Sequence, residues 1–208
     1  MSIRITKITP QKKRKDRYAL FQEQTFVIGV SQETLLKYGL HVGSTLSDNE
    51  FNQLKIEEGI VALRNQALRY LSRRAHSVKE LRDKLKQKGY AVTSIETVLN
   101  GLIEKGFLDD AAFAGMFLRE ELRLKKSGPL LIKNKLLAKG ISREQIEKVL
   151  AEGYDERMQY ENCHALASKK LNTLQAFPEQ KQREKLAGYL KQKGFTWDTC
   201  QGIFEELF

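Results

Sequence analysis

Residues 72–110 read SRRAHSVKELRDKLKQKGYAVTSIETVLNGLIEKGFLDD, and this stretch sets the pattern of the chain. Ser77 and Glu80 form an S-x-x-E signal, which caps the start of a helix. Gly89 suits the position just past the end of that helix, where basic residues complement the helix dipole. The stretch therefore predicts a basic amphipathic helix, followed by an acidic amphipathic helix that ends at Gly106.

The central part of this pattern occurs three times. A leucine followed by a helix-ending glycine stands at Leu85-Gly89, Leu136-Gly140 and Leu190-Gly194, and the glycines are 51 and then 54 residues apart. Apolar residues recur six, nine and ten positions after each glycine. These apolar residues are Ile95, Val98, Leu99, Ile146, Val149, Leu150, Cys200, Ile203 and Phe204. The repeat predicts helical units that stack in a quasi-linear array and share apolar surface with their neighbours.

Residues 1–30 follow a different pattern. They are rich in β-branched and aromatic residues separated by polar turns, which predicts an antiparallel sheet of two or three short strands. Ser31 can cap a short helix, and Ser47 with Glu50 forms a capping box at the start of a long connecting helix. Gly59 is a candidate interruption of the long helix, because glycine costs a helix interior roughly 1 kcal/mol relative to alanine.

These signals predict a mainly α fold with tandem three-helix repeats and a small amino-terminal domain that contains β-strands. The amino-terminal domain should occupy residues 1–46 and the connecting helix residues 47–66. The three repeats should occupy residues 67–108, 109–154 and 155–208.

The chain is basic, with a formal net charge of +10 and an isoelectric point near 9.5. This charge favours an anionic partner, of which nucleic acid is the commonest, although a basic protein without special affinity is the alternative. The charge also separates between helices: residues 64–88 carry nine Lys or Arg against two acidic residues, net +7, whereas residues 92–110 carry net −3. Such separation predicts either a basic ridge that neutralises phosphates or ordinary solvated helix faces.

Cys163 and Cys200 stand among apolar helical positions without C-x-x-C spacing, which predicts buried free thiols in a reducing compartment. No apolar run reaches the roughly 18 residues that a membrane span requires, and the start of the chain lacks a signal-peptide core. We therefore expect a cytoplasmic protein that does not enter the membrane.

Two further groups of residues have both a functional and a structural interpretation. The run KKRKDR at 12–17 is either a DNA-contacting arm or a hairpin turn made soluble by charge, and we favour the turn. Aromatic residues beside the helix-ending glycines could stack on bases, but we favour the apolar contact of a helix cap. These residues are Tyr90, Phe107, Tyr154, Phe195 and Trp197.

The sequence offers no convincing catalytic, cofactor or metal site. The histidines lie in different segments without the spacing of metal ligands, and they are His41, His76 and His164. Residues 101–106 have GxxxxG spacing, but Phe107 and Leu108 stand where a phosphate loop needs Lys and Ser or Thr. Asp109 and Asp110 could belong to a metal-dependent nuclease, yet carboxylates at this position more simply cap the next helix. We predict that the protein is not an enzyme and uses no cofactor.

An R-x-x-S-x-x-E-L signal occurs at 74–81, and a G-aromatic-apolar-D-D signal occurs at 106–110. Together with KKSGPLLIKNKLLAKGISREQIEKVL at 125–150, these motifs resemble the RecX family of bacterial regulatory proteins. The resemblance covers roughly residues 55–208, whereas the first 50 residues match only loosely.

The resemblance implies an elongated, curved array of three-helix repeats. It also implies a regulator of the RecA recombinase, active in DNA repair, homologous recombination and the SOS response. Such a regulator binds in the groove of the RecA filament on single-stranded DNA, inhibits ATP hydrolysis and strand exchange, and promotes loss of the filament. We expect a monomer that also binds DNA directly but weakly.

The family gives no fixed set of binding residues, so we assign the site from charge. We expect DNA or filament binding by basic residues of the middle helices and their approaches. These residues are Arg73, Arg74, Arg82, Lys86, Lys88, Lys125, Lys126, Lys133 and Lys135. A stand-alone, sequence-independent DNA-binding protein is the alternative function.

Overall fold

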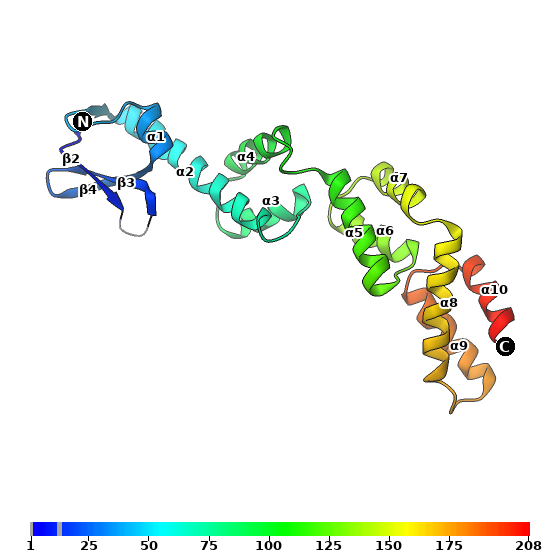
Figure 1. Cartoon of the computed structure of the whole chain (residues 1–208). Coiled ribbons are helices and arrows are strands. Elements are labelled where there is room, and N and C mark those ends of the chain that lie inside the picture. Colours follow the sequence, from blue (N-terminus) through cyan, green and yellow to red (C-terminus); the bar gives the residue numbers. More distant parts are fainter. Residues whose placement is uncertain (1, 12–13) are drawn as a thin grey trace. The chain divides into compact units, whose positions relative to one another are not determined.

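The computed structural model describes residues 2–11 and 14–208, and Figure 1 labels its elements. The chain divides into a first unit, residues 1–74 with 82–102, and a second unit, residues 75–81 with 103–208. The described residues form five strands and ten helices, and the helices make up most of the chain. The predicted mainly α fold with a small β-containing amino-terminal domain is confirmed.

Two small antiparallel sheets form in the first unit. The larger sheet has the order β2 (Lys7–Gln11), β3 (Arg14–Gln22) and β4 (Thr25–Ser31), which confirms the predicted sheet of up to three strands. Strand β1 (Ser2–Arg4) pairs with β5 (Thr45–Ser47) in a second sheet, with Ile3 opposite Leu46. This second sheet brings the start of the chain against the segment that precedes the long helix.

The KKRKDR run starts directly after β2 and continues into β3. Lys12 and Lys13 lie outside the described residues, and β3 begins at Arg14. The choice between a turn and a DNA-contacting arm therefore stays open for this run.

The helices of the first unit begin where the capping signals predict. Helix α1 (Gln32–Lys37) is capped by Ser31, and α2 (Asp48–Leu71) starts with the predicted capping box of Ser47 and Glu50. The expected interruption at Gly59 is wrong, because α2 continues through it without a break. Packing of the opposite face of α2 outweighs the small intrinsic cost of one glycine.

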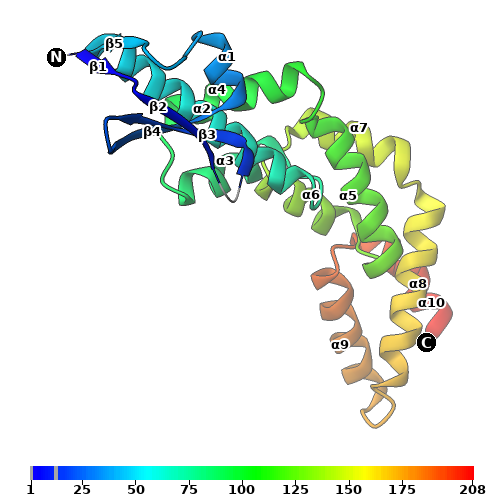
Figure 2. The same ribbon diagram turned by 60° about the vertical axis from the view of Figure 1, so that its left-hand side comes forward.

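A buried carboxylate joins α2 to the sheet. Glu58 accepts a hydrogen bond from Arg17 Nη2 at 2.9 Å and another from the backbone N–H of Ser31 at 2.7 Å. Glu58 is only 5% exposed, so the ion pair fills part of the interface between the strands and the helix. Figure 2 shows α2 lying beside this sheet.

The remaining helices form the repeats. After the end of α2 they are α3 (Val78–Gln87), α4 (Val92–Glu104), α5 (Asp110–Lys125), α6 (Pro129–Ala138), α7 (Arg143–Gly153), α8 (Glu156–Asn172), α9 (Glu179–Gln192) and α10 (Trp197–Leu207). The glycines that mark the repeat, Gly89, Gly140 and Gly194, have φ of +82°, +85° and +87°. Glycine adopts this left-handed conformation without the steric cost that a Cβ atom brings, which is why it ends each middle helix.

The second and third repeats each enclose an apolar core in the second unit. Leu136 and Ile146 are buried in the second repeat, and Leu190 and Ile203 are buried in the third. Helix α8 packs against both α9 and α10 (Figure 2). The apolar positions that define the sequence repeat therefore supply the centres of these cores.

The cysteines belong to the core of the third repeat. Cys163 and Cys200 are buried free thiols whose Sγ atoms lie 3.9 Å apart, as the sequence predicts. Burial raises the pKa of both thiols, which keeps them in the neutral form at physiological pH.

Of the five aromatic residues beside the glycines, two are buried, two are largely exposed and Tyr90 is half-buried. Tyr154 and Phe195 are 2% and 3% exposed and pack in the cores of their repeats, which confirms the predicted cap contact. Phe107 and Trp197 are 57% and 61% exposed, so the cap interpretation is wrong for these two residues. Their rings are accessible to solvent.

Helix ends meet head to tail in the second unit. At the start of α6, the backbone N–H of Gly128 donates to the carbonyl oxygen of Lys193 at 2.8 Å. The N–H of Leu130 donates to the carbonyl oxygen of Gly194 at 3.0 Å. These bonds satisfy N–H groups that have no partner within α6, and they oppose the positive end of α6 to the negative end of α9.

The same kind of contact occurs at the first turn of α3, which also belongs to the second unit. Ser77 Oγ donates to the carbonyl oxygen of Lys139 at 2.7 Å, and Lys79 Nζ donates to the carbonyl oxygen of Ala138 at 2.9 Å. Ser77 precedes Gly128 by 51 residues, and Lys139 precedes Lys193 by 54 residues. The contact is therefore part of the structural repeat.

Replacing Gly128 by alanine should break the contact between α6 and α9. The new Cβ would stand 2.4 Å from both the carbonyl carbon and the carbonyl oxygen of Gly194, so the backbones would have to separate. We expect Gly128→Ala to lower the free energy of unfolding by about 1–3 kcal/mol, measured by urea denaturation. Gly188→Ala in α9 is the matched control, since no atom lies within 4 Å of its new Cβ and helix propensity should add up to about 1 kcal/mol. Equal unfolding midpoints for the two variants would contradict this account.

Candidate nucleic-acid interface

The first group of predicted binding residues lies at the end of α2 and on α3. Arg73, Arg74, Lys86 and Lys88 are exposed. Arg82 is half-buried and differs from them, because it is held in an ion pair with α4. Arg73, Lys86 and Lys88 are therefore accessible to an anionic partner, whereas Arg74 already has an interaction within the protein.

Arg82 donates to Glu96 through both ends of its guanidinium group. The Nε–Oε1 distance is 2.7 Å and the Nη2–Oε2 distance is 2.9 Å. The hydrogen bonds from Arg82 hold the pKa of Glu96 below its usual value against the opposing effect of burial, and the charge of Lys86 adds to the lowering. This geometry joins the basic middle helix to the acidic third helix of the first repeat.

Two residues of the second group, Lys125 and Lys135, bind a buried carboxylate. Glu121 on α5 accepts hydrogen bonds from Lys125 Nζ at 2.7 Å, from Lys135 Nζ at 2.6 Å and from Ser127 Oγ at 2.8 Å. Burial raises the pKa of Glu121, but these three hydrogen bonds outweigh it, so the pKa lies below its usual value. Lys125 and Lys135 therefore neutralise a charge inside the protein.

The other two residues of the second group do not join this cluster. Lys133 forms an ion pair with Glu147 on α7. Lys126 is exposed and ends α5 in the left-handed conformation, with φ of +51°. Of the nine predicted residues, Arg82, Lys125, Lys133 and Lys135 are thus engaged in ion pairs.

The two cross-helix ion pairs are equivalent. Lys133 follows Arg82 by 51 residues, and Glu147 follows Glu96 by the same number. The opposite charges of the middle and third helices therefore partly compensate each other within a repeat. In the third repeat the corresponding positions hold Ala187 and Gln201, which cannot form this pair. Aligning the three repeats at these positions is a sequence signal that the charge counts overlooked.

The paired aspartates have structural partners. Asp109 Oδ1 accepts hydrogen bonds from the N–H groups of Ala111 and Ala112 at 2.8 and 3.0 Å, as an N-cap does. Asp110 Oδ1 accepts from the N–H of Val78 at 2.9 Å. Both aspartates thus accept hydrogen bonds from N–H groups at the start of a helix. The described residues contain no cluster of three or more His, Cys, Asp or Glu able to hold a metal ion.

Among the described residues, no helix is both long enough and apolar enough to cross a membrane.

Family models match the chain in the order of its parts. The model of the regulatory protein RecX N-terminal domain matches residues 3–47. Models of the first, second and third three-helix domains of RecX match residues 64–102, 109–150 and 157–204. A regulatory protein RecX of Clostridium botulinum (strain Alaska E43 / Type E3) is 31% identical over 98% of this chain and 95% of its own length. The chain belongs to the RecX family.

Other RecX proteins support the same assignment. The regulatory protein RecX of Listeria monocytogenes serotype 4a is 30% identical over 93% of this chain and 72% of its own length. A crystal structure of regulatory protein RecX matches with a TM-score of 0.82 and 25% identity, covering 99% of this chain and 100% of that one. A RecX structure from Lactobacillus salivarius matches with a TM-score of 0.65 and 30% identity, covering 73% of this chain and 97% of that one. The family likeness thus includes the amino-terminal residues, where the sequence motifs matched only loosely.

Glu121→Gln should destabilise the second repeat and change how its stability depends on pH. The native pKa of Glu121 is lowered, so its stabilisation is present above the unfolded pKa of about 4.3 and is lost as the pH falls through the lower native pKa. We expect a loss of about 1–3 kcal/mol at pH 7 that shrinks as the pH is lowered to about 3, measured by urea denaturation of variant and wild type.

Glu120→Gln is the control, because it removes the neighbouring exposed carboxylate and should change stability by less than about 0.5 kcal/mol. A loss for Glu121→Gln that does not depend on pH would argue against the charged network.

Proposed function

We propose that this RecX-family chain regulates the RecA recombinase without catalysing a reaction. It binds along the groove of the RecA filament on single-stranded DNA and suppresses ATP hydrolysis and strand exchange. The observation that carries the proposal is the succession of four RecX domains along the chain, together with curated relatives named regulatory protein RecX. We expect the protein to act as a monomer in the cytoplasm.

Exposed cations give this proposal a physical basis. Lys86, Lys88 and Lys126 stand at helix ends with their side chains in solvent, and Arg73 follows α2. Lys and Arg at such positions can neutralise phosphates and release counterions without reading base sequence. Several weak contacts on one chain add through effective concentration, which favours an extended filament over a free subunit.

The ion pairs refine the set of contacts that we propose. Arg82, Lys125, Lys133 and Lys135 would each have to leave a carboxylate before binding phosphate. We therefore propose four exposed residues as the primary contacts and the paired residues as secondary ones. The primary contacts are Arg73, Lys86, Lys88 and Lys126. Arg74 is also exposed but already has an interaction within the protein, so we count it with the secondary contacts.

The test measures RecA ATP hydrolysis on single-stranded DNA over a series of concentrations of this protein. The wild type should inhibit hydrolysis, and Lys86→Glu with Lys88→Glu should need roughly tenfold more protein for the same inhibition, since about 1.4 kcal/mol of lost affinity has this effect. Lys105→Glu with Lys148→Glu is the matched control, because both lysines are exposed and the change in net charge is the same.

The alternative function is sequence-independent DNA binding without a recombinase partner, which the net charge of +10 supports. Tight, salt-dependent binding to DNA with no effect on RecA ATP hydrolysis or strand exchange would contradict the regulator and favour this alternative.

A further inference from the structure

The third repeat is open at the place where an ion pair spans the other two. Ala187 on α9 and Gln201 on α10 occupy the positions of Lys133 and Glu147, 54 residues further along the chain. A cavity of about 600 Å³ lies here, with both Ala187 and Gln201 in its lining. This volume is within the usual range of small-molecule sites, roughly 300–1,000 Å³.

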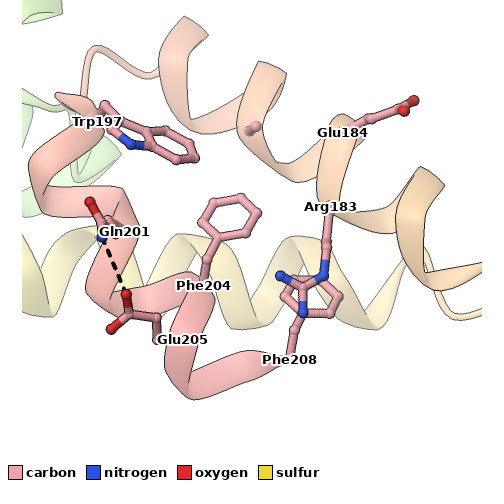
Figure 3. A pocket seen from close by; sticks show the side chains of 8 residues that line it. Arg183, Glu184, Trp197, Gln201, Phe204, Glu205 and Phe208 are labelled. Atoms are coloured by element: carbon pink, nitrogen blue, oxygen red, sulfur yellow. Dashed lines mark hydrogen bonds between the residues drawn. The ribbon is translucent and has the colours of Figure 1, made fainter.

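Aromatic rings form one wall of this cavity. Trp197 lies with its ring centroid 5.8 Å from that of Phe204, and Phe204 lies 5.8 Å from Phe208. The guanidinium carbon of Arg183 stands 4.4 Å from the centre of the Phe208 ring (Figure 3). Trp197 is 61% exposed, so a large part of its indole is accessible to a ligand.

A second cavity, of about 530 Å³, also contains Trp197 in its lining. Its other lining residues include Gly188 and Lys191 of α9 and the half-exposed Leu130 of α6. Ala187 lines both cavities, and the small side chains at 187 and 188 leave room beside the indole. Trp197 therefore has a cationic residue in each adjoining cavity, Arg183 in one and Lys191 in the other.

The charges around Trp197 favour a nucleic acid over an apolar protein segment. Residues 179–193 carry five Lys or Arg against two Glu, net +3. Arg183 Nε donates to Glu179 Oε1 at 2.9 Å, but both side chains of this pair are exposed, and a surface pair of this kind is weak enough for a phosphate to displace the carboxylate. The acidic residues of the cavity are placed less centrally: Glu205 accepts a hydrogen bond from Gln201 at 3.3 Å, and Glu184 points away from the rings (Figure 3). Asp198 and Glu205 on α10 would keep the phosphates on the α9 side.

We propose that the third repeat stacks an unpaired base of single-stranded DNA on Trp197, with Arg183 and Lys191 binding the flanking phosphates. An aromatic ring beside cations is the arrangement by which proteins hold single strands without sequence preference, and each stacked base contributes about 1–3 kcal/mol. This site goes beyond the proposed regulation of RecA, because it binds DNA in the absence of any recombinase.

Trp197 is the only tryptophan in the chain, so tryptophan fluorescence, excited selectively over that of the seven tyrosines, reports on this site alone. Titration with an oligothymidylate at low salt should quench the fluorescence to saturation, and added salt should reverse the quenching. Trp197→Ala should weaken binding of a labelled oligothymidylate about 5- to 150-fold, measured by anisotropy, whereas Trp197→Phe should retain most of the affinity.

Val92→Ala is the matched control, because Val92 is 54% exposed and occupies the position of Trp197 in the first repeat. It should bind the oligonucleotide as the wild type does. Unchanged thermal unfolding of Trp197→Ala would separate loss of the site from loss of the fold.

The proposal is overturned if the oligonucleotide leaves the fluorescence unchanged, or if Trp197→Ala binds DNA as tightly as the wild type. Quenching by a RecA filament but not by DNA alone would assign Trp197 to a protein contact and would also overturn it. Quenching by DNA without inhibition of RecA ATP hydrolysis would contradict only the proposed regulation.

Discussion

The contact between helix ends is the constraint on which the repeats of the second unit depend. The start of α6 meets the end of α9 through backbone atoms, and this approach is possible because Gly128 and Gly194 have no side chains. Each glycine thereby has a role that its neighbours cannot take over. Gly194 ends its own helix in the left-handed conformation and also leaves room for Leu131 of α6, whose N atom would lie 2.3 Å from an added Cβ. Helix termination and repeat packing are thus parts of one local structure.

A second constraint is that several Lys and Arg side chains form ion pairs with carboxylates of the same chain. The chain has an excess of ten positive charges, yet Lys125 and Lys135 are bound to Glu121, and Arg82 is bound to Glu96. A cation in such a pair binds phosphate only by giving up its carboxylate, so it contributes less to the affinity for an anion than an exposed lysine does. The capacity of a repeat to bind nucleic acid therefore depends on which of its cations lack an acidic neighbour, and net charge is a poor guide to it.

The separation in sequence between interacting residues explains which features could be predicted from the sequence. Helix starts such as those at Ser47 and Asp109 depend on hydrogen bonds to residues two or three positions away, so short motifs locate them. The buried carboxylates could not be predicted in this way. Glu58 binds Arg17, 41 residues away in the sequence, and a glutamate in a helix normally predicts a solvent-exposed face. The candidate site was predictable as a set of basic residues, but the pairing of four of them depends on partners that only the folded chain brings near.

The third repeat lacks an ion pair that the first two repeats share. In the first two repeats a basic and an acidic residue link the middle and third helices, and Val92 and Arg143 begin the third helix. In the third repeat the link is replaced by Ala187 and Gln201, and Trp197 begins the helix with most of its ring in solvent. The Trp197 ring contacts Phe204 at the edge of the core but leaves most of its surface in solvent, which is the part that the proposed site uses to bind a base. A repeat protein can vary the residues that link the middle and third helices without disturbing the glycine contacts. The reason is that this link lies on a different part of the repeat from the helix ends that join one repeat to the next.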